Sequence, residues 1–175
     1  MNLRIRNIIV AIILLGTIAC GKIRQISPVP HIEFRQFELF DTIEPQLGNP
    51  AKAAIITFYF EDGDGDIGIQ QPVEGETDTL NLFFTAYLKE NGVFVEPSPT
   101  DNVQSTSFRI PYIERTGQNQ IIQGTMDIIM FYYFFNPEDT VKYEFYLKDR
   151  AGNLSNTEVT CEIPFSMTGS CVLND

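Results

Sequence analysis

Hydrophobic and polar residues alternate over most of the chain, and this period of two is typical of half-buried β-strands. In LNLFFTAYLK every second residue from Leu80 to Leu88 is apolar, and in TVKYEFYLKD the apolar set runs from Val141 to Leu147. No comparable run favours a long helix. The pattern predicts strands at residues 32–40, 52–61, 80–90, 93–96, 106–113, 120–135, 140–148 and 155–163.

Turn signals between these strands favour antiparallel neighbours. Asn91-Gly92 lies between YLKE and VFVE and indicates a tight hairpin, because both residue types tolerate a positive φ. In the closing segment NTEVTCEI, we expect the alternate residues from Thr157 to Ile163 to face inward. Short strands joined by such turns predict an all-β fold, an antiparallel β-sandwich of seven or eight strands.

The N-terminus predicts export. MNLRIRN carries two arginines and no acid, and IIVAIILLG is apolar but short for a membrane span. The sequence TIAC, which ends at Cys20, resembles a bacterial lipoprotein box. The resemblance implies that residues 1–19 are a removed signal peptide and that lipid on Cys20 anchors the chain to a membrane. An ordinary cleaved signal peptide or an uncleaved anchor is the alternative.

Composition limits the partners of the mature chain. Removal of residues 1–19 takes away Arg4 and Arg6, which leaves 10 basic against 23 acidic residues and a net charge of −13. Such a surface repels nucleic acid, so no nucleic-acid partner is expected. The remaining length favours one domain at 31–165, after a tether at 20–30 rich in proline, and before a C-terminal tail at 166–175.

The stretch EDGDGDIG at residues 61–68 crowds three aspartates, Asp62, Asp64 and Asp66, directly after an apolar strand. At contact distance in water such carboxylates repel by about 1 kcal/mol per pair, whereas calcium accepts six to eight hard oxygen ligands. The stretch is therefore either a calcium site with a structural role, clamping the loop at 62–79, or a solvated acidic turn, because Asp-Gly repeats are common in turns. The spacing is not that of an EF-hand.

A weak internal repeat adds Asp149 as a fourth candidate carboxylate for the metal site. FYFED, ending at Asp62, is matched by FYLKD, ending at Asp149, and the second continues as DRAGNLSN. DRAGNLSN resembles the F–G hairpin of bacterial immunoglobulin-like and fibronectin-type-III-like domains. In an immunoglobulin-like sandwich the loops after the second and the penultimate strand share one end. We therefore expect Asp149 to join Asp62 at that end.

Together, the strand entering DGDGDIG, the central hairpin and the closing DRAGNLSN look like a group of Bacteroidota lipoproteins with an immunoglobulin/fibronectin-III-like domain. The resemblance implies the fold and brings no activity with it. Surface-exposed members of that group tend to have an acidic run after the lipidated cysteine, whereas GKIRQ at 21–25 is basic. The resemblance thus favours the outer membrane, facing the periplasm, over the cell surface.

The remaining cysteines, Cys161 and Cys171, predict a disulfide in an oxidising compartment, since the tail can turn at residues 168–170. The alternative is an inert buried thiol at Cys161 and a loose tail.

One segment, DIIMFYYFF at 127–135, is apolar without alternation. It is either a central strand covered on its outer face or an exposed patch at Phe131, Tyr133 and Phe135 for a protein or glycan partner.

Catalytic motifs are absent from the sequence: it has no Gly-x-Ser-x-Gly elbow, no His-Glu-x-x-His and no phosphate loop. We therefore expect a non-catalytic binding or assembly component of the cell envelope. A purely structural calcium-clamped module is one alternative, and a carbohydrate-active enzyme using carboxylates at the end of the sandwich is another.

Overall fold

A computed structural model describes residues 26–77, 79–114 and 120–172. These residues form ten strands and no helix. The strands are β1 (His31–Ile43), β2 (Pro50–Asp62), β3 (Leu82–Glu90), β4 (Val93–Val95), β5 (Thr106–Phe108), β6 (Ile122–Tyr132), β7 (Thr140–Leu147), β8 (Glu158–Val159), β9 (Ile163–Pro164) and β10 (Gly169–Cys171).

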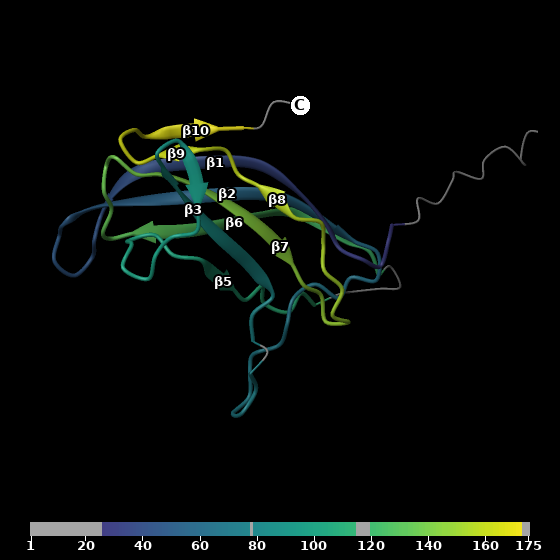
Figure 1. Ribbon diagram of the computed structural model, residues 1–175. Helices are drawn as coiled ribbons and strands as arrows, with labels where there is room; N and C mark the ends of the chain where they lie inside the picture. Colours follow the sequence, from purple (N-terminus) through teal and green to yellow (C-terminus); the bar gives the residue numbers. More distant parts are fainter. Residues whose placement is uncertain (1–25, 78, 115–119, 173–175) are drawn as a thin grey trace, which may run out of the picture.

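Two antiparallel sheets pack face to face (Figure 1). One has the order β10-β1-β2-β6, and the other has the order β4-β3-β7-β8, with β5 beside β3 and β9 beside β7. The distribution of β1, β2 and β6 to one sheet and of β3, β7 and β8 to the other is that of an immunoglobulin-like sandwich. The predicted fold class is confirmed, although the strands number ten because β9 and β10 are short additions near the C-terminus.

The alternation in β3 and β7 places the core as expected. The inward sets are buried, and their rings meet across the sheets: Phe145 stacks on Phe84 with centroids 4.9 Å apart and contacts Phe58 of β2 at 5.4 Å. Leu80 is the exception, because β3 begins only at Leu82 and leaves Leu80 exposed. Aromatic pairs of this kind stabilise the core beyond the area that they bury.

The closing segment departs from the predicted single strand. Only Glu158–Val159 pairs as β8, and Thr160, expected outward, is buried instead. The backbone N–H of Tyr143 donates to Thr160 Oγ1 at 3.0 Å, and Thr160 N donates back to the Tyr143 carbonyl at 2.9 Å. A side chain that replaces a ladder hydrogen bond breaks the period of two.

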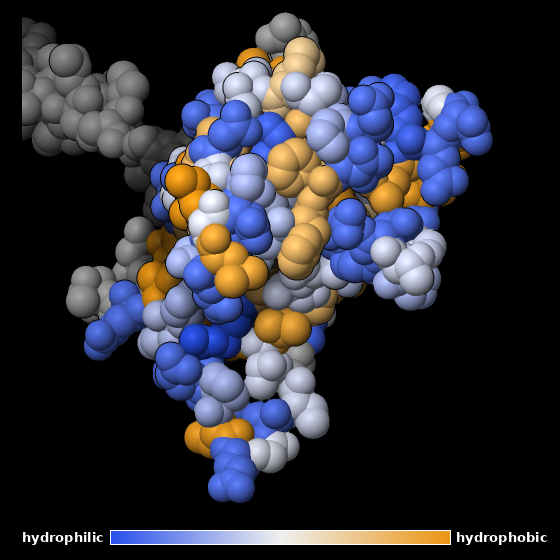
Figure 2. All heavy atoms as spheres, turned by 90° about the vertical axis from the view of Figure 1, so that its left-hand side faces the viewer, coloured by the Kyte–Doolittle hydropathy of each residue, from blue (hydrophilic) through white to orange (hydrophobic). Residues whose placement is uncertain are grey.

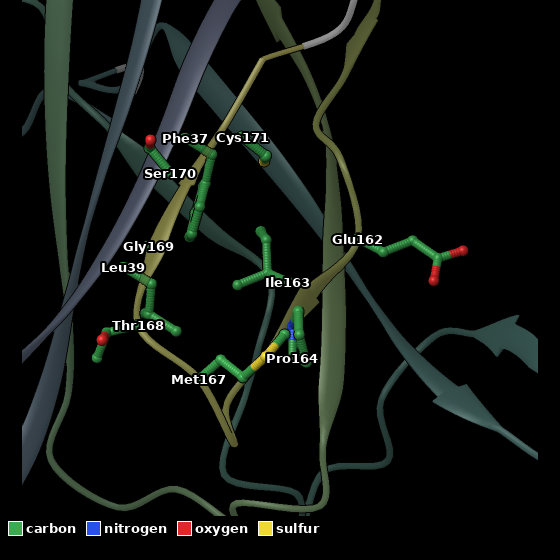
Figure 3. A pocket seen from close by; sticks show the side chains of 10 residues that line it. All are labelled: Phe37, Leu39, Glu162, Ile163, Pro164, Met167, Thr168, Gly169, Ser170 and Cys171. Atoms are coloured by element: carbon green, nitrogen blue, oxygen red, sulfur yellow. The ribbon is translucent and has the colours of Figure 1, made fainter.

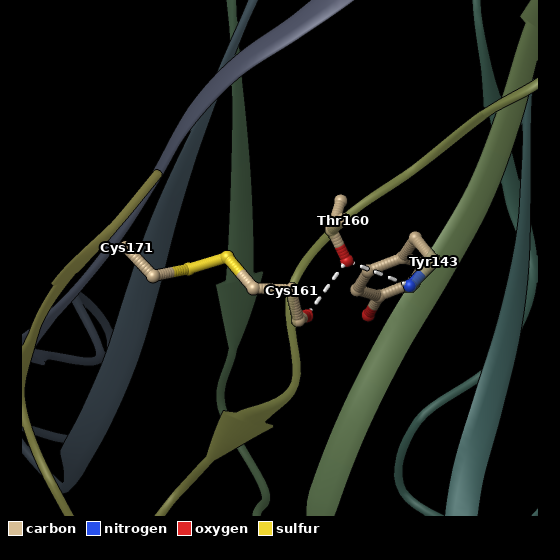
Figure 4. The surroundings of a disulfide bond; sticks show 4 residues. All are labelled: Tyr143, Thr160, Cys161 and Cys171. Atoms are coloured by element: carbon tan, nitrogen blue, oxygen red, sulfur yellow. Dashed lines mark hydrogen bonds between the residues drawn. A yellow bond between two sulfur atoms is a disulfide. The ribbon is translucent and has the colours of Figure 1, made fainter. Parts of the chain in front are cut away.

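The predicted disulfide is confirmed, and in the described part of the tail, up to residue 172, Gly169–Cys171 forms β10, so that part is not loose. Cys161 lies between β8 and β9, and Cys171 lies in β10, with a Cα–Cα distance of 6.6 Å (Figure 4). Because β10 pairs with β1, the disulfide links the two sheets along one side of the sandwich. A cavity of about 200 Å³ lies next to it, lined by Phe37, Leu39 and Met167 among others (Figure 3).

The predicted signal peptide and the lipidated Cys20 lie outside the described residues. Of the expected tether at 20–30, residues 26–30 are described, and they lie against the domain: Pro30 is buried, and the Ser27 carbonyl accepts a hydrogen bond of 2.8 Å from Gly63 N. In the described ranges no helix is long and apolar enough to cross a membrane.

Candidate metal centre

The three aspartates of EDGDGDIG lie where β2 ends and the chain turns away from the sheet. Ile67, fully buried, anchors this turn in the core. Gly65 and Gly68 have φ values of 63° and 89°, which residues with a Cβ rarely adopt, so they allow the tight path between the aspartates and the rest of the loop. The loop at 62–68 is therefore packed into the end of the sandwich.

Gly63 is required for a different reason. Its φ is not positive, but a Cβ at this position would lie 2.3 Å from the Ile26 carbonyl oxygen and 2.6 Å from that of Ser27. The glycine thus lets the end of the tether pass directly over the acidic loop. Nothing in the sequence pattern around Gly63 signals this close approach.

The carboxylates converge. One oxygen from each of Asp62, Asp64 and Asp66 lies within 4.8 Å of the other two. Asp62 is 0% exposed, and its Oδ2 accepts a hydrogen bond of 2.8 Å from Asp66 N. Its Oδ1 is buried and has no hydrogen-bond donor among the described residues. The same holds for Asp66 Oδ1, while Asp66 Oδ2 accepts from Ala151 N at 3.0 Å.

This convergence disfavours the ionised state of the cluster. Burial raises the pKa of Asp62 to about 6, and the neighbouring charges of Asp64 and Asp66 add to the shift, against hydrogen bonds from backbone N–H groups. Burial also raises the pKa of Asp66, and the charges of Asp149 and Asp64 act in the same direction. A bound cation would reverse this effect by neutralising the cluster.

The loop after β7 meets the acidic loop, as the internal repeat predicts. Arg150 N donates to the Asp66 carbonyl at 3.3 Å, and the Arg150 guanidinium donates to the Gly68 carbonyl at 2.7 Å. The guanidinium also lies over the ring of Tyr112, 5.0 Å from its centroid. We call this end of the sandwich, formed by residues 62–68 and 148–154, the acidic rim.

Asp149 is at the acidic rim but is not one of the three converging carboxylates. It is 2% exposed, and Asn153 satisfies both of its oxygens: the backbone N donates to Oδ1 at 2.7 Å, and Nδ2 donates to Oδ2 at 2.8 Å. The expectation that Asp149 shares the rim is met, and its carboxylate closes a turn there. An asparagine four residues after an aspartate in DRAGNLSN was the available signal for this turn.

The donor set suits a hard cation. Three carboxylates can supply three of the six to eight oxygen ligands of calcium, and water or carbonyl groups can supply the others. The buried oxygens of Asp62 and Asp66 without donors are unusual, because buried polar atoms are nearly always hydrogen-bonded. A solvated turn does not explain them, since Asp62 is inaccessible to solvent.

The predicted partner patch is only partly assembled. Phe131 and Tyr133 are 54% and 42% exposed, and their rings stack with centroids 5.8 Å apart. Phe135 instead contacts Phe165 of the core at 6.1 Å, because β6 ends at Tyr132 and its alternation ends there. Phe134, which was not part of the predicted patch, is exposed.

The position of β6 excludes one of the two interpretations of DIIMFYYFF. Within the described residues β6 is the last strand of its sheet, so a central strand covered on its outer face is wrong. Figure 2 views the end of the sandwich that lies at the left of Figure 1, and hydrophobic residues appear there in several groups among hydrophilic ones. This end is opposite the acidic rim.

No protein-family model, no curated protein and no solved structure matches this chain.

Proposed function

We propose that this chain is a non-catalytic, lipid-anchored component of the cell envelope, a binding or assembly module whose acidic rim is clamped by calcium. One observation carries the calcium clamp: Asp62 Oδ1 is buried without a hydrogen-bond donor among the described residues, and Asp62 belongs to a group of three carboxylates that each place one oxygen within 4.8 Å of the others. A buried charge needs a partner, and a divalent cation is the partner that fits three converging carboxylates.

The clamp would join three segments at the base of the domain. The acidic loop contacts the end of the tether through the bond from Gly63 N to the Ser27 carbonyl, and it contacts the loop after β7 through Ala151 N and Arg150 N. Fixing the acidic loop with an ion therefore also fixes the angle at which the tether leaves the domain. For a protein held at a membrane by its N-terminus, this angle orients the opposite end.

The membrane anchor rests on the N-terminal sequence, where an apolar run ends in TIAC at Cys20. The basic GKIRQ that follows supports the periplasmic face of the outer membrane. The exposed, stacked Phe131 and Tyr133 support a binding role toward an envelope protein or glycan. They lie at the end of the sandwich opposite the tether.

The geometry gives less support to a glycosidase. Retaining glycosidases hold their two carboxylates about 5–5.5 Å apart and inverting ones hold them farther apart, on either side of a bound sugar. The converging oxygens at the acidic rim lie within 4.8 Å of one another, and Asp62 is fully buried. A sugar cannot reach Asp62, whereas an ion enclosed with it during folding can.

The test of the clamp is thermal denaturation of the mature domain in millimolar calcium and in chelator. At ten times Kd, calcium should add about 1.4 kcal/mol and raise Tm by a few degrees, with a smaller effect of magnesium, which demands stricter geometry. Asp64→Asn should weaken the response. Asp101→Asn, in a turn near the opposite end, is the matched control and should keep it. Equal melting temperatures with and without calcium would refute the clamp.

The anchor is tested separately in cells. Radiolabelled palmitate should enter the wild-type chain and not Cys20→Ser, which should appear as a soluble or unprocessed form. Failure of the wild-type chain to incorporate label would refute lipidation without touching the calcium result.

A further inference from the structure

Strand β6 is a long sheet edge. In the part of the chain that the structure describes, its one strand neighbour is β2, along a continuous register from Lys52↔Tyr132 to Asp62↔Ile122. The strand has 11 residues. The other outer strands, β4, β5, β8, β9 and β10, have two or three residues each. One edge of the sandwich therefore differs from the others in length.

Soluble proteins usually carry features that prevent pairing at such an edge, because its outward N–H and C=O groups can hydrogen-bond to another chain. The usual devices are lysine, proline, a bulge or a covering segment. In β6 there is no lysine, no proline and no register shift, and Asp127 is its single charge. Its outer face instead exposes Ile129 and Phe131 over about half of their surface. The edge has the properties of a strand that receives a partner.

A cavity of about 310 Å³ opens beside the same edge, between the two sheets. Its lining includes Phe108 of β5, Met130 and Tyr132 of β6, and Tyr143 of β7. The hydroxyl groups of Tyr132 and Tyr143 hydrogen-bond to each other at 3.0 Å, so the buried polar atoms there are already satisfied. Asn102, Gln104 and Thr106 also line the cavity, so an incoming side chain would meet both apolar and polar groups there.

We infer that the β6 edge receives an extended peptide segment of a partner protein, which adds a fifth strand to this sheet and inserts a side chain into the cavity. The inference rests on the proposed binding role and names its partner class. Strand addition takes affinity from main-chain hydrogen bonds and specificity from pockets for alternate side chains, and β6 with its cavity offers both. The acidic charge of the chain favours a segment with lysine or arginine.

A second copy of this chain fits the edge less well. Each copy has a net charge of −11, so two copies repel. A second β6 would also bring its own Met130 and Tyr132, which are buried in their own core and cannot enter the cavity. A peptide segment without a core of its own has side chains free to fill it.

The first step of the test is selection of a displayed library of random ten-residue peptides on the monomeric domain. Enriched peptides should alternate apolar residues and carry lysine or arginine. Hydrogen exchange with the most enriched synthetic peptide should show new protection of alternate amides in β6. Phe131→Lys should weaken its binding at least tenfold. Val172→Lys, a control with the same exposed fraction of 54%, should change the affinity less than twofold.

The second step uses the backbone of that peptide. Methylation of successive peptide nitrogens should reduce affinity at least tenfold at every second position and less than twofold between them, since a strand bonds its neighbour with period two. Three results would overturn the inference: no enrichment, protection outside β6, or a wild-type dimer that Phe131→Lys converts to a monomer. Binding should persist in chelator, so a failed calcium clamp and a failed docking edge give different results.

Discussion

Two aspartates at the acidic rim differ in one respect. Asp62 and Asp149 each end a strand of the repeated pattern FYFED or FYLKD, and each is buried. Asn153 satisfies both oxygens of Asp149. In Asp62, Asp66 N satisfies Oδ2, while Oδ1 is buried without a donor among the described residues, and the carboxylate lies beside those of Asp64 and Asp66. The two aspartates therefore lie at the same end of the sandwich and are both buried, but they differ in the hydrogen-bond partners of their carboxylate oxygens.

The hydrogen-bond partners of the oxygens indicate which of the two buried carboxylates needs a ligand. A buried carboxylate whose lone pairs are filled by the protein is a structural cap, and its removal leaves donors without acceptors. A buried carboxylate next to two others is unfavourable until a cation or a proton neutralises it. Asp149 is therefore expected to act without calcium and Asp62 with it.

The largest effect is expected from Asp149→Ala. The substitution leaves both donors of Asn153 without a partner in a buried turn, and it should reduce the free energy of unfolding by about 2–3 kcal/mol. The loss should be the same in calcium and in chelator, because Asp149 is outside the three converging carboxylates. Urea denaturation under both conditions measures it. A loss that appears only with calcium would make Asp149 a metal ligand and end the contrast with Asp62.

Asp62→Asn should act in the opposite direction. In chelator at pH 7 it removes a buried charge and keeps an acceptor for Asp66 N, so the unfolding free energy should rise by about 1–2 kcal/mol. In calcium the advantage should disappear or reverse, since the variant lacks a charged ligand. Urea curves of wild type and variant with and without calcium give the comparison. A variant less stable than wild type in chelator would contradict the unsatisfied state of Asp62.

The stability of the calcium-free protein should also depend on pH. Burial raises the pKa of Asp62 to about 6 in the fold from its ordinary value of 3.8, so between these pH values the folded state binds the proton more tightly. The contribution of Asp62 to the stability of the calcium-free protein should therefore fall as pH rises from about 4 to about 6 and stay level above. Calcium competes with that proton, so its stabilising effect should grow over the same range.

The difference between wild type and Asp62→Asn, measured by thermal denaturation at several pH values in chelator, isolates this contribution from the other acids. A difference independent of pH between 4 and 6 would show that the Asp62 proton is not held by the fold.

The sequence predicted the parts of the fold and of the acidic rim that follow from a periodic or repeated pattern. Alternation placed Tyr143 and Phe145 in the core, and the repeat of FYFED as FYLKD placed two aspartates at one end. It could not predict contacts between distant segments. Two such contacts are the close approach of Ser27 to Gly63 and the hydrogen bond from Tyr143 N to Thr160 Oγ1. Neither contact follows from the alternation of apolar and polar residues.

The candidate site was likewise predicted only as far as a local sequence pattern determined it. Three aspartates with one glycine between each pair were enough to predict a cluster at Asp62, Asp64 and Asp66. The role of Asp149 depended on Asn153, whose two donors compete with any ion for that carboxylate. At the other end of the sandwich, the apolar run at 127–135 gave no signal that β6 ends at Tyr132. Phe135 lies beyond that end and contacts Phe165 of the core.

The most direct test of the account is a crystal structure grown in millimolar calcium, with anomalous scattering to identify the ion. The account predicts one calcium ion at about 2.3–2.6 Å from Asp62 Oδ1 and from carboxylate oxygens of Asp64 and Asp66, with Asp149 still bonded to Asn153. A rim without anomalous signal, with a water molecule or a neighbouring carboxyl group against Asp62 Oδ1, would contradict it.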